Sequence, residues 1–266
     1  MNIGKYNIDI DSQCHIMGIL NVTPDSFSDG GKYNNLDAAR FQVEKMISDG
    51  ATIIDVGGES TRPGYTMISD EEEIERVCPV IRMIKQEFDI CVSLDTYKSK
   101  VLEAAYPEGV DIINDIWGFK RDRELATFAA KNNLTCVLMH NREEAVYNDF
   151  VSDVVKDLRE SVDIALNAGV SPERIIVDPG VGFAKDYEQN LEIIRSLDRL
   201  QMLGFPVLLA ASNKSVVGNT LNLPADQRLE GTIAVNVTGV LNGARIFRVH
   251  DVKPNLLAIR MAEALL

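Results

Sequence analysis

The chain has 266 residues, 45% of them hydrophobic, which is enough for one large domain with a full core. No apolar run approaches the ~20 residues that a membrane span needs, and residues 1–12 lack the pattern of a signal peptide. The formal net charge of −13 opposes binding to nucleic acid or to an anionic membrane, so an anionic substrate would need a local cationic cluster or a metal ion.

Eight short apolar runs are predicted to be β-strands, at residues 15–20, 52–56, 90–94, 110–113, 135–139, 175–177, 207–211 and 246–249. Between them lie segments with apolar residues at helical spacing. These predict helices over 36–47, 74–84 and 191–200, the last before the stop signal Gly204, and near 98–106, 123–131, 151–168, 231–241 and 254–265.

A strand followed by a helix, repeated eight times in about 250 residues, predicts a single (β/α)8 TIM barrel domain over residues 1–266. A doubly wound open sheet is the alternative, but its usual G-x-G-x-x-G turn after the first strand is absent. The loops after the first two strands are long and rich in Gly, Pro, Ser and Asp, which is typical of mobile or functional loops.

The four cysteines form no C-x-x-C pair and no regular framework, and three of them lie in apolar strand-like runs. This pattern favours buried, reduced thiols and therefore a cytoplasmic location.

Polar residues end all eight predicted strands, and in a barrel such residues meet at one rim. Helix capping and turns would explain about half of these residues one at a time, but they explain the whole set poorly. They are Asn21, Asp55, Asp95, Asn114-Asp115, His140, Asp178, Ser212-Asn213-Lys214-Ser215, and Arg248 with His250.

Arg248 and His250 are two apart on the last strand, so together with Ile246 they should share its inner face. Barrels often bind phosphate near the loops after strands seven and eight, which favours a phosphate site here. A buried ion pair of Arg248 with Asp178 or Asp251 is the alternative.

Asp95, Asn114 and Asp178 form a second set, which suits a flat heterocycle with several N–H donors, such as a pterin or guanine edge. Met139 and Phe183 could cover the ring faces or belong to the plain core. Metal binding by the carboxylates is the alternative. No residue spacing typical of a tight zinc site supports it, and a weakly bound Mg2+ held by a diphosphate fits the sequence better. Lys214 and Ser215 precede a predicted helix, where they could bind an anion or simply cap the helix.

Eight segments, in order, resemble the motifs of dihydropteroate synthase, the pterin-binding enzyme family of the folate pathway. They are residues 21–31 (NVTPDSFSDGG), 55–64 (DVGGESTRPG), 93–96 (SLDT), 112–115 (IIND), 138–141 (LMHN), 178–185 (DPGVGFAK), 212–215 (SNKS) and 248–250 (RVH).

The resemblance implies a transferase that joins 6-hydroxymethyl-7,8-dihydropterin diphosphate to p-aminobenzoate with Mg2+, in a homodimer packed through its late helices, and a family that sulfonamides inhibit. It implies pterin contacts by Asp95, Asn114, Met139, Asp178, Phe183 and Lys214, diphosphate contacts by Asn21, Thr61, Arg62, Arg248 and His250, and a metal contact by Asn21. It also implies aminobenzoate contacts by Phe27, Thr61, Pro63, Phe183 and Ser215, with Asp95, Lys214, Arg248 and His250 as the catalytic set.

One position departs from the family pattern, which most often reads Ser-Arg-Lys-Ser where this chain has Asn213 second. The change removes a cation next to Lys214, and with it charge and planar stacking area. The other hypotheses are a non-catalytic pterin-binding paralogue, a methyltetrahydrofolate-dependent methyltransferase and a purely structural barrel. A non-catalytic paralogue should have lost the long loops after the first two strands, and both are intact here. A methyltransferase has no diphosphate for Arg248 and His250 to bind. A structural barrel has no reason to carry polar groups at all eight strand ends.

Overall fold

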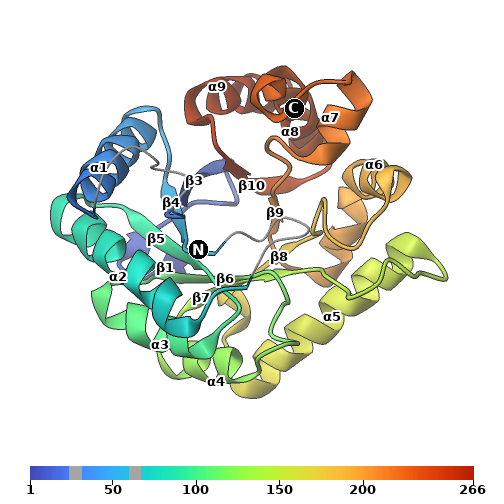
Figure 1. Ribbon diagram of the computed structural model, residues 1–266. Coiled ribbons are helices and arrows are strands. Elements are labelled where there is room, and N and C mark those ends of the chain that lie inside the picture. Colours follow the sequence, from blue (N-terminus) through green and yellow to red (C-terminus); the bar gives the residue numbers. More distant parts are fainter. Residues whose placement is uncertain (24–31, 60–66) are drawn as a thin grey trace.

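The computed structural model describes residues 1–23, 32–59 and 67–266, without the side chains of 32–35. Eight parallel strands close into a barrel in the order β10-β3-β4-β5-β6-β7-β8-β9, which confirms the predicted fold class. Helices surround the barrel on all sides (Figure 1). The strands are β3 (His15–Asn21), β4 (Ile53–Gly57), β5 (Cys91–Asp95), β6 (Ile112–Asp115), β7 (Thr135–Met139), β8 (Ile175–Asp178), β9 (Val207–Leu209) and β10 (Ala244–Val249).

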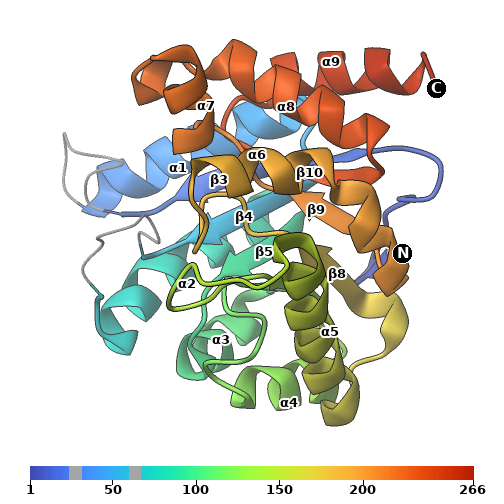
Figure 2. The same cartoon turned by 90° about the vertical axis from the view of Figure 1, so that its right-hand side faces the viewer.

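The helices follow the strands in the expected alternation, and they pack between the barrel and solvent. They are α1 (Lys32–Ser48), α2 (Asp70–Glu87), α3 (Ser99–Ala105), α4 (Glu124–Lys131), α5 (Phe150–Ala168), α6 (Tyr187–Arg195), α7 (Ser215–Leu221), α8 (Leu229–Leu241) and α9 (Val252–Glu263). Figures 1 and 2 show α7, α8 and α9 side by side along one flank.

Local sequence explains where several helices begin and end. The Ser69 hydroxyl accepts a hydrogen bond from the Glu72 amide at 3.1 Å and caps α2, whose first turn is acidic. Asp186 and Gln189 form a reciprocal capping box at the start of α6. The single helix predicted over 191–200 is wrong, because α6 ends at Arg195 and a tighter 3₁₀ segment, Leu197–Leu203, continues to Gly204, whose φ is +81°.

The barrel interior is apolar at the end where the strands begin. The inward-facing residues there come one from each strand, as the period of two requires. A short hairpin, β1 (Asn2–Ile3) and β2 (Tyr6–Asn7), and the segment after it close this end with Ile3, Ile8 and Ile10. Figure 2 shows the N-terminus at this end of the barrel. The polar N-terminal sequence gave no sign of this plug. The strand residues are Met17, Ile53, Cys91, Ile112, Val137, Ile176, Leu208 and Ile246.

The opposite face of each strand packs against the helices in a second, larger core, which includes Phe247 and Val249. The alternation therefore leaves the inner positions at the other end of the strands for polar side chains. Strand register aligns them, since Asn21 pairs with Gly57, Gly57 with Asp95, and Asp95 with Asn114. Asn21, Asp95 and Asn114 thus lie in one layer at the barrel mouth, where barrels of this class carry their active sites.

Candidate active site at the barrel mouth

Arg248 of β10 is the centre of a buried ion-pair network. Its Nε lies 2.6 Å from Asp55 Oδ2 and its Nη2 lies 2.6 Å from Asp95 Oδ2. The Asp55 side chain is fully buried, and that of Arg248 is only 17% exposed. Burial lowers the pKa of Arg248, but the carboxylates of Asp55 and Asp95 outweigh it and raise the pKa above its ordinary value. The guanidinium is therefore charged and already positioned at the mouth.

The predicted partners of Arg248 were wrong. The sequence suggested Asp178 or Asp251 for the ion pair, whereas the closed barrel brings strands β4 and β5 across from β10. Asp55 was predicted as a polar strand end but was given no binding or catalytic role. A charged residue inside the otherwise apolar strand Ile53–Gly57 was the signal that could have found it, because an unpaired buried carboxylate is too costly to keep.

Asn114 belongs to this network, and Asp178 lies at the end of β8 at the same mouth. The Asn114 side-chain amide donates to Asp55 Oδ2 at 3.2 Å, and Asp178 Oδ1 accepts from the Gly180 amide at 2.7 Å. Burial raises the pKa of Asp95 to about 7, although Arg248 opposes the shift, and burial also raises the pKa of Asp178. Carboxylates with raised pKa values at one mouth are typical of a functional site.

Lys214 lies over the other side of the mouth, at the N-cap of α7. Its ammonium donates to the Val181 carbonyl and sits 4.8 Å from the centre of the Phe183 ring. Phe183 packs on a small apolar cluster of Tyr97, Ile116 and Met139, so the two predicted ring-covering residues belong to one apolar group. Burial lowers the pKa of Lys214 to about 8, an effect that the charge of Asp178 partly offsets.

Asn21 and His250 lie at the edges of this layer. A Cβ atom added to Gly57 would lie 3.6 Å from Asp95 Cβ and 3.7 Å from Asn21 Oδ1, so Gly57 leaves space between these two side chains. His250 Nδ1 is 2.9 Å from the Ser212 hydroxyl, which in turn accepts from the His250 amide at 3.2 Å. This pair fixes the end of β10 against the start of the α7 loop.

Ser215 begins α7 and is exposed, and the N-cap position belongs to Lys214, which makes no side-chain capping bond. Simple capping by Ser215 is therefore not its role. Four other predicted contacts lie outside the described residues: Phe27, Thr61, Arg62 and Pro63.

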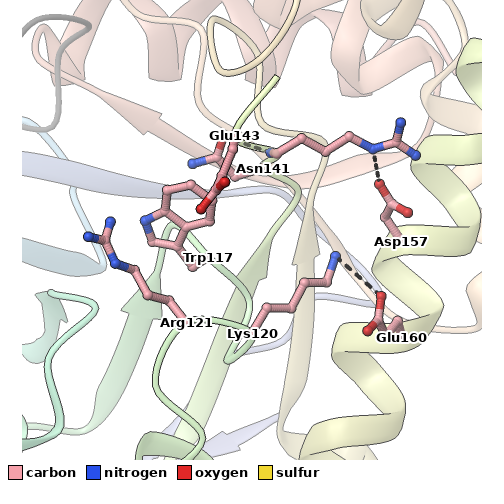
Figure 3. Close-up of a pocket in the computed structure, with 8 residues that line it drawn as sticks. Trp117, Lys120, Arg121, Asn141, Glu143, Asp157 and Glu160 are labelled. Atoms are coloured by element: carbon pink, nitrogen blue, oxygen red, sulfur yellow. Dashed lines mark hydrogen bonds and ion pairs between the residues drawn. The ribbon is translucent and has the colours of Figure 1, made fainter. Parts of the chain in front are cut away.

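A hollow of about 710 Å³ lies beside the mouth and contains none of the predicted site residues. Figure 3 shows it between the segment of Trp117, Lys120 and Arg121 and the helix α5, which carries Asp157 and Glu160. Its charges are of both signs and partly paired, as in Lys120 with Glu160 at 4.0 Å. The remaining residues of its wall are Asn141, Arg142 and Glu143.

The family model for pterin binding enzymes matches residues 17–250, and the chain belongs to this family. It is 54% identical to the dihydropteroate synthase of Clostridium beijerinckii over 264 residues, which are 99% of this chain and 98% of that protein.

Solved structures agree with this assignment. The crystal structure of dihydropteroate synthase from Clostridium difficile, in the presence of pteroic acid, aligns with a TM-score of 0.95 at 48% identity, over 97% of this chain and 99% of that one. The Xanthomonas albilineans dihydropteroate synthase with 4-aminobenzoic acid aligns with a TM-score of 0.92 at 37% identity, over 96% and 94% of the two chains. The activity of this chain is accordingly that of a dihydropteroate synthase, a transferase of folate biosynthesis.

Asn213, the departure from the family pattern, has a backbone φ of +56°. Asparagine tolerates this left-handed conformation better than most residues. The backbone N–H of Asn213 donates to the Thr232 hydroxyl at 3.1 Å, and its backbone carbonyl accepts from Arg228 Nη1 at 2.9 Å. The local backbone is thus well supported without a cation at this position.

We expect Asn213→Arg to change the KM of either substrate by less than about tenfold, because Lys214 and Ser215 remain in place, and to lose about 1 kcal/mol of stability to the left-handed backbone. Steady-state kinetics with both substrates and urea unfolding check this. A hundredfold gain in kcat would show that the natural sequence is catalytically impaired and would contradict the functional assignment.

The pKa values of Asp95 and Lys214 predict a narrow pH optimum for capture of the pterin substrate. In the pterin contacts that the sequence motifs imply, Asp95 would be ionised to accept ring N–H groups, above about pH 7, and Lys214 would be protonated to donate, below about pH 8. The kcat/KM for pterin diphosphate should therefore fall on both sides of this window. In Lys214→Met the alkaline limb should disappear while the acid limb stays; an unchanged alkaline limb would assign it to another group.

Proposed function

We propose that acidic and amide side chains at the barrel mouth bind the pterin ring, and that cationic side chains there bind the diphosphate leaving group. The ring edge, with its 2-amino group and ring N–H, would donate to Asp95 and Asp178, and Asn114 can both donate and accept. The single observation that carries this proposal is the contact of Arg248 with Asp55 and Asp95, because it joins the two sets of residues in one network.

In this reaction the C–O bond between the pterin methylene and diphosphate breaks, and a C–N bond to p-aminobenzoate forms. Arg248 and His250 would stabilise the charge that develops on the departing diphosphate. Asp95, next to Arg248, is the best candidate to stabilise the methylene cation. The arylamine is neutral near pH 7 and attacks without a strong base, losing its proton afterwards. Much of the rate then comes from holding the two reactants in register.

We propose Mg2+ as the metal of this site, with Asn21 as its protein ligand. Among residues 1–23, 36–59 and 67–266 no group of three or more His, Cys, Asp and Glu could hold a metal ion. A single amide oxygen from Asn21 fits Mg2+, which keeps several waters and binds through few protein oxygens and substrate phosphates. When bound, the ion would offset the charge of the diphosphate oxygens.

Phe27, Thr61, Arg62 and Pro63, which lie outside the described residues, complete the proposal together with Ser215 and Phe183. By their place in the sequence motifs, Thr61 and Arg62 would contact the diphosphate, and Phe27, Thr61 and Pro63 the aminobenzoate ring. The exposed hydroxyl of Ser215 at the start of α7 is available to the aminobenzoate carboxylate.

We also propose that the chain is a homodimer that packs through its late helices. Large apolar side chains are exposed on α7, α8 and α9 and after α9, which is an unusual concentration for a solvated surface. Light scattering on the wild type and on Leu257→Glu with Met261→Glu tests this, since the variant should be monomeric. The residues are Leu221, Leu241, Leu257, Met261, Leu265 and Leu266.

A cytoplasmic location is proposed from the cysteines. All four are free and buried, as expected for a reducing compartment. Within the described part of the chain no helix is long and apolar enough to span a membrane.

Incubation with pterin diphosphate, p-aminobenzoate and Mg2+ tests the proposed reaction. Release of diphosphate that requires the arylamine, together with formation of dihydropteroate, is the expected result. Binding of a pterin without diphosphate release would favour the non-catalytic paralogue, and methyl transfer from methyltetrahydrofolate would favour the methyltransferase.

A further inference from the structure

Lys185, in the loop between β8 and α6, has its ammonium group surrounded by three acceptors. Its Nζ lies 2.9 Å from His140 Nδ1, 3.0 Å from the Gly180 carbonyl and 3.0 Å from the Phe183 carbonyl. Burial lowers the pKa of Lys185 to about 7, although the charge of Asp178 opposes this shift. In its charged form the amine has three protons to donate, and this geometry uses all of them. Two of the three bonds tie together the two ends of the turn from Gly180 to Phe183.

His140, which the sequence placed among the polar strand ends of the mouth, is fully buried and faces Lys185 instead. Because its Nδ1 accepts from Lys185, its Nε2 must carry the ring proton, and it donates that proton to Asp157 Oδ2 at 3.1 Å. Asp157 also accepts from Arg142 Nε at 2.6 Å. Burial lowers the pKa of His140 to about 4, in agreement with a neutral imidazole.

The turn that Lys185 ties supplies much of the mouth. The Gly180 amide donates to Asp178, the Val181 carbonyl accepts from Lys214, and the Phe183 ring lies under the Lys214 ammonium. The backbone at Gly180 has a φ of +69°, and an added Cβ there would lie 2.0 Å from the His140 carbonyl oxygen. The turn therefore packs directly against the His140 segment.

We propose that Lys185, held by the neutral imidazole of His140 and through it by Asp157, is a positioning residue for the pterin pocket. It does not touch the substrate. Its ammonium fixes the turn from Gly180 to Phe183 so that the Phe183 ring and Lys214 meet the pterin in one arrangement. The inference deepens the proposed function and rests on the pterin occupying the layer of Asp95, Asn114 and Asp178.

The chain offers a matched control in Tyr147, whose hydroxyl donates to the Ala184 carbonyl in the same loop at 2.7 Å. Tyr147→Phe also removes one hydrogen bond to this loop, but it leaves the carbonyls of Gly180 and Phe183 tied. Lys185→Met removes the charge and all three hydrogen bonds at nearly constant volume. His140→Gln is a milder variant, because it alters only one of the three partners of Lys185.

Calorimetric titration with 6-hydroxymethylpterin, and separately with inorganic diphosphate, distinguishes a positioning role from general damage. Lys185→Met should weaken pterin binding by tenfold or more, His140→Gln by about threefold, and Tyr147→Phe by less than twofold. Diphosphate binding should stay within twofold in all three, because Arg248 is hydrogen-bonded to Asp55 and Asp95, and His250 to Ser212, none of which belongs to this turn.

Wild-type pterin affinity in a folded Lys185→Met variant would overturn the inference, and so would equal losses for pterin and diphosphate. If Lys185→Met fails to fold, His140→Gln decides, since unchanged pterin affinity in that variant would also overturn it. A wild-type protein that binds no pterin would instead refute the proposed function, so the two failures are distinguishable.

Discussion

Arg248→Met should lower the free energy of unfolding by about 3–5 kcal/mol, the scale for removing one partner of a buried ion pair. The variant leaves Asp55, whose side chain is fully buried, and Asp95 without their common cation. Urea unfolding at neutral pH measures the loss, with an unchanged m-value as the sign that the fold is the same.

The control is Arg82→Met, because Arg82 forms a two-point ion pair with Glu108 from a side chain that is 53% exposed. Its loss should stay below about 1 kcal/mol. Asp55→Asn placed on Arg248→Met should recover part of the stability, since an amide is cheaper to bury than a carboxylate. A loss below about 1 kcal/mol in Arg248→Met would mean that the mouth network is not the buried cluster described above.

Lys214→Ala and Asp178→Ala should each weaken pterin binding by about 1.5–3 kcal/mol, the scale for hydrogen bonds to charged groups. This corresponds to roughly a tenfold to hundredfold rise in the dissociation constant of 6-hydroxymethylpterin. Both side chains face the mouth. Burial lowers the pKa of Lys214 and raises that of Asp178, so the charged form of each is poorly solvated. A ligand that hydrogen-bonds to these groups stabilises their charged forms.

Calorimetry on the two variants and on Lys131→Ala, an exposed lysine in the last turn of α4, provides the comparison. Lys131→Ala should bind the pterin as the wild type does. Normal pterin affinity in both Lys214→Ala and Asp178→Ala would place the pocket elsewhere in the molecule.

The barrel was predictable because its signals are local. Each strand is a short apolar run between two amphipathic segments, and the period of two assigned Ile246 and Arg248 to one face and Phe247 to the other, as the two cores show. The N-terminal plug was not predictable, because Ile3, Ile8 and Ile10 are spaced among polar residues and gain their role only from the open end of the barrel.

The polar residues at the strand ends predicted most of the layer at the mouth, but they did not predict which side chains form ion pairs there. Arg248 and Asp55 are 193 residues apart, and only closure of the barrel brings them within 2.6 Å. Composition predicts that Arg248 needs an anionic partner, yet several acids at the same rim could satisfy it equally well.

His140 was predicted to lie at the mouth, and its side chain lies elsewhere. It directly follows β7, and its amide still donates to the Asp178 carbonyl at 2.9 Å. The alternation that puts Val137 inside the barrel puts His140 on the outer face. The side chain leaves the mouth for Asp157 and Lys185. A polar residue at a strand end therefore need not face the mouth, because the period of two along the strand decides which way its side chain points.

A crystal structure with pterin diphosphate and Mg2+ tests the central claim most directly. The expected density has the ring against Asp95, Asn114 and Asp178, and the diphosphate on Arg248 and His250, with the ion near Asn21. A ring bound in the hollow beside Trp117, or a diphosphate away from Arg248, would contradict it.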